Sequence, residues 1–209
     1  MRHAITSLLA LFALALSGAS GAAECPGPVE VIRGASSEIL EMLKNRRAEL
    51  EGDSPALYAA VDEILLPRFD RRYSGGLVMG KYWRRATAEQ REEFILALYR
   101  SLLRTYSENI LEYKEDQLKV LPLENPPDDK AVVETLVTLE RGVETPVSYR
   151  MRKTDDCWKA YDVIIEGISY VTNYRQQYAG EFKQKGIDAV IAELKAKGAE
   201  APADPGTGN

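Results

Sequence analysis

Among the residue types that commonly carry out chemistry, histidine is nearly absent from this chain. The only histidine is His3, which lies in a stretch with the features of a removable leader. Without it, the mature chain has no Ser-His-Asp or Cys-His pair, no imidazole proton shuttle and no imidazole metal ligand. The sequence excludes the histidine-dependent classes of enzyme and metal site. We expect no metal ion and no cofactor.

Two cysteines, Cys25 and Cys157, are the other reactive side chains. Two thiolates alone cannot complete a structural zinc site. In an oxidising compartment they could form a disulfide that closes a very long loop. The alternative is that Cys25 lies on a mobile N-terminus and Cys157 is an unpaired turn residue. The sequence leaves both alternatives open.

Two carboxylates stand out by their surroundings. Asp162 interrupts an otherwise apolar strand, and Glu166 lies at a predicted strand-to-helix junction, where a negative charge near a helix N-terminus is favourable. Asp162 fits either a structural hydrogen-bonding role or the base of an enzyme that acts on an apolar substrate. Ser169 lacks the second glycine of a nucleophile elbow, and the glycines at 75, 76 and 80 do not fit a phosphate-binding fingerprint.

Residues 1–23 have the pattern of a secretory signal peptide. Arg2 precedes an apolar run over residues 4–16, and small residues follow it. The run is shorter than the roughly 20 apolar residues of a membrane-spanning helix. Cleavage after Ala22 or Ala23 fits the small-residue rule, so we expect export, most simply to a bacterial periplasm.

The rest of the chain predicts one domain and a short tail. Residues 24–197 are long enough for one substantial core, whereas residues 198–209 are small, polar and proline-containing, as in disordered tails. The chain has 27 Lys and Arg against 32 Asp and Glu, a formal net charge of −5. This acidic balance makes nucleic acid a poor candidate partner.

One segment departs from the acidic balance. Residues 68–85 contain six basic residues and one acidic residue, Asp70. Such a cluster is either a solvated face that pairs with nearby carboxylates, or a contact for an anionic headgroup or an acidic partner. The segment also has an apolar patch, Leu77 to Trp83, and irregular glycine spacing.

Apolar spacing predicts helices on both sides of a central sheet. A period of 3.6 residues runs over residues 28–51, and Ser54 with Pro55 begins a second helix that ends near Pro67. Thr87 and Gln90 form a capping box that begins a long helix to about Leu111. After the sheet, the pattern predicts a helix over residues 167–185 and a short closing helix from Ile187.

Between these helices the apolar period changes to two. Four strands are expected, over residues 117–123, 130–140, 145–154 and 157–165, joined by short turns. Short turns between consecutive strands indicate an antiparallel meander. The sequence therefore predicts an α+β fold in which a four-stranded antiparallel sheet is wrapped by about six to seven helices, around either an apolar pocket or a filled core.

Three stretches of the sequence resemble the MlaC family, whose members are periplasmic phospholipid-binding components of a lipid transport system and are also described as toluene-tolerance proteins. They are VDEILLPRFDRRYSGGLVMGKYWRRATAEQREEF, WKAYDVIIEGISYVTNYRQQY and KGIDAVIAELK. The resemblance covers about residues 54–197. The cysteines are not part of the family pattern.

The resemblance implies a non-enzymatic carrier that buries acyl chains and maintains outer-membrane lipid asymmetry. Its implied partners are phospholipid, an outer-membrane lipoprotein–porin complex and an inner-membrane ABC transporter with an MCE-domain protein, and we expect a monomer. The residues expected to contact acyl chains are Leu77, Val78, Tyr82, Leu98, Leu102, Val137, Val147, Tyr149, Met151, Ile168 and Val171. Those expected to contact a headgroup or a partner are Arg71, Arg72, Lys81, Arg84, Arg85, Arg150 and Arg152.

Two other functions fit the same residues. One is the enzyme with Asp162 as its base, which requires this carboxylate to face a cavity. The other is a non-catalytic periplasmic interaction module, which requires a filled core.

Overall fold

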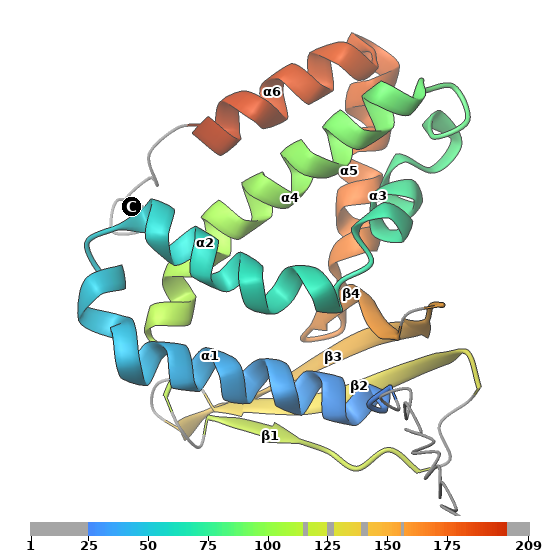
Figure 1. Ribbon diagram of the computed structural model, residues 1–209. Coiled ribbons are helices and arrows are strands. Elements are labelled where there is room, and N and C mark those ends of the chain that lie inside the picture. The colour runs from blue at the N-terminus through green and yellow to red at the C-terminus, as the bar shows by residue number, and fades with distance from the viewer. Residues whose placement is uncertain (1–24, 115–116, 125–127, 139–141, 156, 200–209) are drawn as a thin grey trace, which may run out of the picture.

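The chain folds into a layer of helices over one antiparallel sheet, as this computed structural model shows (Figure 1). It describes residues 25–114, 117–124, 128–138, 142–155 and 157–199. Within these residues lie six α-helices, two 3₁₀ turns and a five-stranded sheet. The α+β class predicted from the sequence is confirmed. The expected leader lies outside the described residues.

The helices begin and end close to the expected positions. The capping box at Thr87 is present, with the Gln90 N–H donating to Thr87 Oγ1 over 3.1 Å. The second helix is capped by Asp53 rather than by Ser54. The last helix includes Gly198, where the sequence predicts the tail to begin. The bounds are α1 Pro28–Leu50, α2 Ser54–Leu65, α3 Arg71–Met79, α4 Ala88–Leu111, α5 Tyr170–Lys185 and α6 Ile187–Ala199.

The segment that seemed irregular in the sequence contains a helix. The side chain of Asp70 accepts a hydrogen bond from the Tyr73 N–H and begins α3. Gly75 lies inside α3, where this helix packs closely on α4. A Cβ at this position would stand only 2.5 Å from Ile95 Cγ1, so a larger residue would not fit. Gly75 therefore permits close packing of α3 on α4, and the 3₁₀ turns η1 (Leu66–Arg68) and η2 (Gly80–Tyr82) flank the helix.

The sheet has five strands where the sequence predicts four. Its order is β1-β2-β3-β4-β5, every neighbour antiparallel, with bounds β1 Leu118–Val120, β2 Lys130–Thr138, β3 Glu144–Lys153, β4 Trp158–Ile165 and β5 Ile168–Ser169. The extra strand is β5. Glu166 and Gly167 both have positive φ, 49° and 81°, so the chain reverses tightly before it enters α5. Glu166 lies in this exposed turn rather than beside a helix N-terminus.

Register assigns the strand residues to two faces. Val133, Tyr149 and Val163 lie opposite one another on one face, which we call the inner face. Arg150 and Asp162 lie opposite each other on the other face. A bulge near Tyr161 shifts the register, so Met151 lies opposite Ala160.

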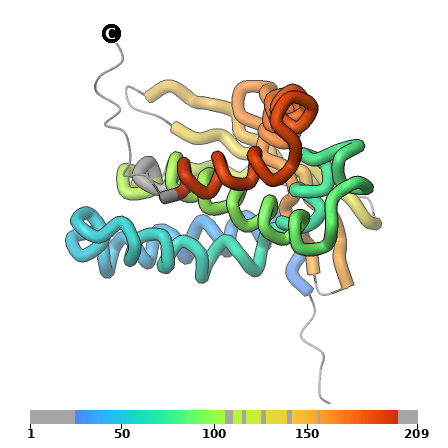
Figure 2. Tube along the Cα trace, turned by 90° about the horizontal axis from the view of Figure 1, so that it is seen from above, coloured from blue at the N-terminus to red at the C-terminus, as the bar shows by residue number. Residues whose placement is uncertain are grey.

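Three apolar clusters form the core. The first joins α3, α4, α5 and α6 around Phe94 and Phe182. The second packs the start of α1 on the inner face around Met151 and Trp158. The third joins α1, α2 and the end of α4 around Leu57. Figure 2 shows α1 beside α2, and α6 along α4. None of the helices in the described ranges carries an apolar stretch long enough to cross a bilayer.

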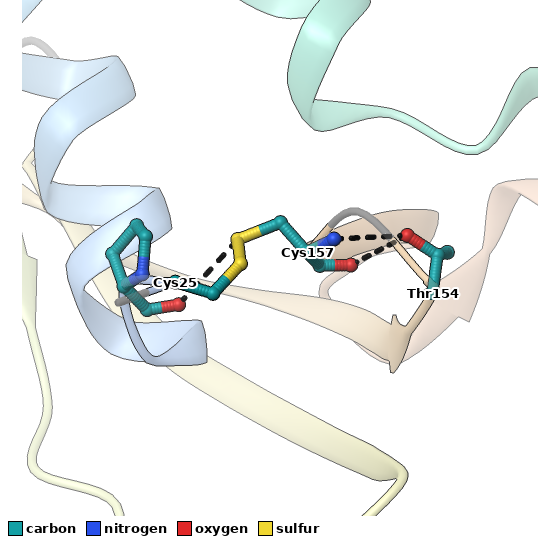
Figure 3. The surroundings of a disulfide bond; sticks show 4 residues. Cys25, Thr154 and Cys157 are labelled. Atoms are coloured by element: carbon teal, nitrogen blue, oxygen red, sulfur yellow. Dashed lines mark hydrogen bonds between the residues drawn. A yellow bond between two sulfur atoms is a disulfide. The ribbon is translucent and has the colours of Figure 1, made fainter. Parts of the chain in front are cut away.

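A disulfide ties the start of α1 to the turn between β3 and β4 (Figure 3). Cys25 and Cys157 have Cα atoms 5.6 Å apart and are separated by 132 positions in the sequence. The turn is also ordered by Thr154, whose Oγ1 donates to the Cys157 carbonyl over 2.7 Å. Of the two alternatives left by the sequence, the structure has the bonded pair.

Asp162 joins the sheet to α5. It is 1% exposed; one carboxylate oxygen accepts from the Val171 N–H over 3.0 Å, and the other accepts from Ser169 Oγ over 2.6 Å. Arg150 lies 3.3 Å from the second oxygen. A buried carboxylate with these partners orients the first turn of α5 relative to β4.

We predict that reduction destabilises the protein. The disulfide closes a loop of more than a hundred residues, so its loss should lower the free energy of unfolding by about 2–4 kcal/mol. Urea unfolding with and without reductant measures this. A Cys25→Ser/Cys157→Ser variant should be as unstable as the reduced protein and insensitive to reductant. Equal midpoints for oxidised and reduced wild type would contradict the prediction.

We also predict that Asp162→Ala costs about 2–3 kcal/mol of unfolding free energy, because it leaves the Ser169 hydroxyl and the Val171 N–H without their buried acceptor. The matched control is Asp155→Ala, at an exposed turn position, which should change stability by less than about 0.5 kcal/mol. Chemical unfolding of both variants provides the comparison. Equal effects would show that the carboxylate does not secure α5.

Candidate functional site

The inner face of the sheet is covered unevenly. Near the turn between β3 and β4, the start of α1 covers it, and Ala131, Val133, Met151, Trp158 and Ala160 are all buried. Toward the opposite end, Val137, Tyr149, Val163 and Ile165 are only half-buried. On the same face Thr135, Thr145 and Val147 are buried, so the half-buried apolar side chains lie among covered ones.

α4 and α5 also carry half-buried apolar residues. Val171 lies in the first turn of α5, and its N–H is bonded to Asp162 of β4. It packs against the first cluster together with Leu102, and Leu103 packs against the third cluster. We use the name "junction" for Leu102, Leu103, Val137, Tyr149, Val163, Ile165 and Val171. Their partial exposure indicates that the three clusters do not close completely around one another.

Tyrosine hydroxyls provide the polar groups near the junction. Burial raises the pKa of Tyr149 to about 12, with a further contribution from Tyr113, while a hydrogen bond with Thr135 opposes the shift. Tyr113 Oη lies 2.8 Å from Ser36 Oγ of α1, and burial raises its pKa too. Both phenols keep their protons at neutral pH, and each hydroxyl has a partner in the protein, Thr135 for Tyr149 and Ser36 for Tyr113.

The residues expected to contact acyl chains lie in several different environments. Leu102, Val137, Tyr149 and Val171 belong to the junction, and Val147 is buried opposite Ile165 and Thr135. Val78, Tyr82 and Leu98 are core residues of the first cluster, Met151 is covered by α1, and Leu77 is half-buried on α3. Ile168 lies in β5, 61% exposed, because the β4–β5 turn delays the start of the helix.

Three of the seven predicted headgroup or partner cations form ion pairs within the protein. Arg150 pairs with Asp162 and Arg152 with Asp70. Arg72 pairs with Glu92 over 2.6 Å. Arg71 lies over the ring of Tyr99, 5.4 Å from its centroid. The other three, Lys81, Arg84 and Arg85, are exposed.

A cleft of about 660 Å³ lies outside the junction. It is bordered by η1, the starts of α3 and β4, and the middle of α4. Its lining combines charged residues, including Arg71 and Arg72, with Phe69, Ile95 and the exposed Leu96. None of the eleven residues expected to contact acyl chains lines it.

The position of Asp162 contradicts its role as an enzyme's base. Both of its oxygens accept hydrogen bonds from the protein, and Arg150 pairs with one of them. Its register position lies on the face opposite Tyr149 and Val163. A carboxylate held in this way has no free oxygen toward the junction.

Sequence reasoning missed Val163 and Ile165. The signal was present, because strand alternation in YDVII places both residues on the face away from Asp162. Leu103 was missed for another reason: it is adjacent to Leu102 on a helix whose apolar side is wide, so spacing alone does not separate inner from outer positions.

Comparisons with known proteins identify the family. The family model described as MlaC protein matches residues 33–196. A relative from Pseudomonas putida, named toluene tolerance protein ttg2D, is 31% identical over 189 residues, which is 90% of this chain and 85% of the relative. A Haemophilus influenzae relative, named intermembrane phospholipid transport system binding protein MlaC, is 22% identical and covers 80% of each chain.

A solved structure shares the fold. The phospholipid-binding protein from Ralstonia solanacearum, solved in complex with a phospholipid, superposes with a TM-score of 0.77 at 23% identity. The match covers 83% of this chain and 98% of that one. The family match spans most of the folded part of the chain. This chain belongs to the MlaC family.

Proposed function

We propose that this chain is a periplasmic phospholipid carrier. It takes up acyl chains at the junction and moves lipid between an outer-membrane lipoprotein–porin complex and an inner-membrane ABC transporter with an MCE-domain protein. It has no catalytic role. The observation that carries the proposal is the incompletely covered apolar inner face, in a chain whose relatives include a phospholipid transport protein and a phospholipid-bound structure.

The energetics of transport support a buried site. Two acyl chains contain about 30 methylene groups, and exposing each to water costs about 0.8 kcal/mol, so exposure of both costs on the order of 20 kcal/mol. A lipid therefore crosses an aqueous compartment efficiently only with its chains covered. The junction offers apolar side chains from the sheet, α4 and α5, which are the elements that could surround such chains.

The hydroxyl groups near the junction suit the polar part of a lipid. Because its pKa is about 12, Tyr149 remains a hydrogen-bond donor throughout the physiological pH range. A donor at the edge of an apolar surface fits the ester carbonyls that join acyl chains to glycerol. This arrangement uses features shared by all diacyl phospholipids, so we expect little headgroup selectivity.

A filled-core interaction module is the remaining alternative. It requires that the half-buried junction residues pack fully against one another. Their partial exposure favours the carrier.

We predict that the protein purified from a Gram-negative host carries phospholipid. Extraction with organic solvent followed by mass spectrometry and phosphate analysis measures the amount per chain. Detection of phospholipid at a substantial molar fraction supports the carrier. Its absence from protein that was never exposed to detergent would contradict the proposal.

A matched pair of substitutions on β2 tests the site. Val137→Glu places a carboxylate at the junction, where burial of a charge opposes acyl binding, and should lower bound phospholipid at least tenfold. Val132→Glu makes the same change on the other face of the same strand, at a side chain that is 44% exposed, and should leave the lipid content unchanged. Folding of each variant is checked by circular dichroism. Equal lipid loss in both would place the acyl chains elsewhere.

A further inference from the structure

Four exposed cations gather where α3, α4 and α5 meet. Lys81, Arg84 and Arg85 lie in the connection from α3 to α4, and Arg175 lies on α5. Arg175 reaches this connection, because its guanidinium lies 3.2–3.4 Å from the point where a Cβ on Gly80 would stand. We call these four residues the basic patch. Gly80, with φ of 53°, permits the close approach.

The basic patch brings together four cations that form no ion pair in the described part of the chain, and other cations without one, such as Lys44 on α1 and Lys119 on β1, lie on other elements. Elsewhere, Arg68, Arg72, Arg150, Arg152, Lys185 and Lys195 each form an ion pair. Within the described ranges, no ion pair joins a basic patch residue to a carboxylate. The chain has a formal net charge of −5. Four positive charges without carboxylate partners therefore make this part of the surface locally positive on an acidic protein.

Aromatic rings support the patch from below. Lys81 Nζ and the Arg85 guanidinium lie 5.3 and 5.8 Å from the ring centroid of Tyr82. Tyr82 is 7% exposed, and its hydroxyl donates to the Ala179 carbonyl of α5 over 3.4 Å. The neighbouring Trp83 lies beneath Arg72 and Arg91. Cations that rest on fixed rings lose less side-chain entropy on binding than free ones do.

We propose that the basic patch is the docking surface for an acidic face of a partner protein. The patch contains three arginines, and one of them, Arg85, lies with Lys81 over the buried ring of Tyr82. Arginine and aromatic residues are enriched in protein interfaces. Opposite charges on the two surfaces accelerate encounter and fix orientation. The choice of partners for the test rests on the proposed carrier function.

An anionic membrane surface fits the patch less well. Basic segments that bind membranes gain about 1 kcal/mol of binding free energy per cation, and they also insert apolar side chains into the bilayer. Here Tyr82 is buried and Trp83 is half-buried between two arginines, so no free apolar side chain accompanies the four charges. A protein partner is therefore the occupant that the patch favours.

Charge reversal tests the proposal. Arg84→Glu/Arg85→Glu is compared with Lys44→Glu/Lys119→Glu, which makes the same charge change at exposed positions on α1 and β1. Two protein probes are used, the soluble periplasmic part of the MCE-domain protein and the purified lipoprotein–porin complex. The third probe is a vesicle of phosphatidylcholine with roughly 30% phosphatidylglycerol, an anionic surface of the kind that binds polybasic segments. Binding is measured at low and high salt.

The patch variant should bind at least one protein probe tenfold or more weakly, with less salt dependence than wild type, and the control should bind within about twofold of wild type. Unchanged binding to both protein probes would overturn the proposal. So would a loss confined to the vesicles, which would identify a membrane contact. Loss of co-purified phospholipid from the patch variant would reassign the arginines to the headgroup. If the wild-type protein carried no lipid, the carrier function would be refuted. A docking defect measured for the patch variant would still support the docking surface.

Discussion

The apolar inner face of the antiparallel sheet is the constraint on which the rest of this structure depends. A sheet with one apolar face must be covered, and the start of α1 covers the end nearest the turn between β3 and β4. The disulfide between Cys25 and Cys157 fixes α1 at that end. α4 and α5 pack primarily with α3 and α6, and α5 meets the sheet at β4 and β5. Incomplete cover at the junction follows from this division of the helices.

Asp162 and the bulge beside it determine how α5 leaves the sheet. The bulge changes the register at Tyr161, whose carbonyl accepts a hydrogen bond from the Ser74 hydroxyl of α3. Asp162 then binds the first turn of α5. The most conspicuous carboxylate in the sequence thus fixes the start of α5 on β4.

Much of the fold could be predicted because the signals are local. The Thr87 capping box, the break at Gly186 and the alternation of β3 each depend on a few adjacent residues, and the structure has all three. Helix α3 and strand β5 were missed because they depend on distant contacts or unusual backbone: Gly75 packs on Ile95, and Glu166 adopts a positive φ. The candidate site was harder still. Spacing identified apolar faces, but it could not tell Met151, sealed by α1, from Tyr149, two residues away and half-buried.

The central claim is that acyl chains lie against the junction, and photo-crosslinking tests it most directly. A phospholipid with a diazirine near the end of one acyl chain is loaded into the protein, irradiated, and the modified residues are mapped by mass spectrometry. The account predicts labels on junction residues of the sheet, α4 and α5, such as Val163, Leu103 and Val171. Labels confined to the lining of the outer cleft, around Phe69 and Leu96, would contradict it.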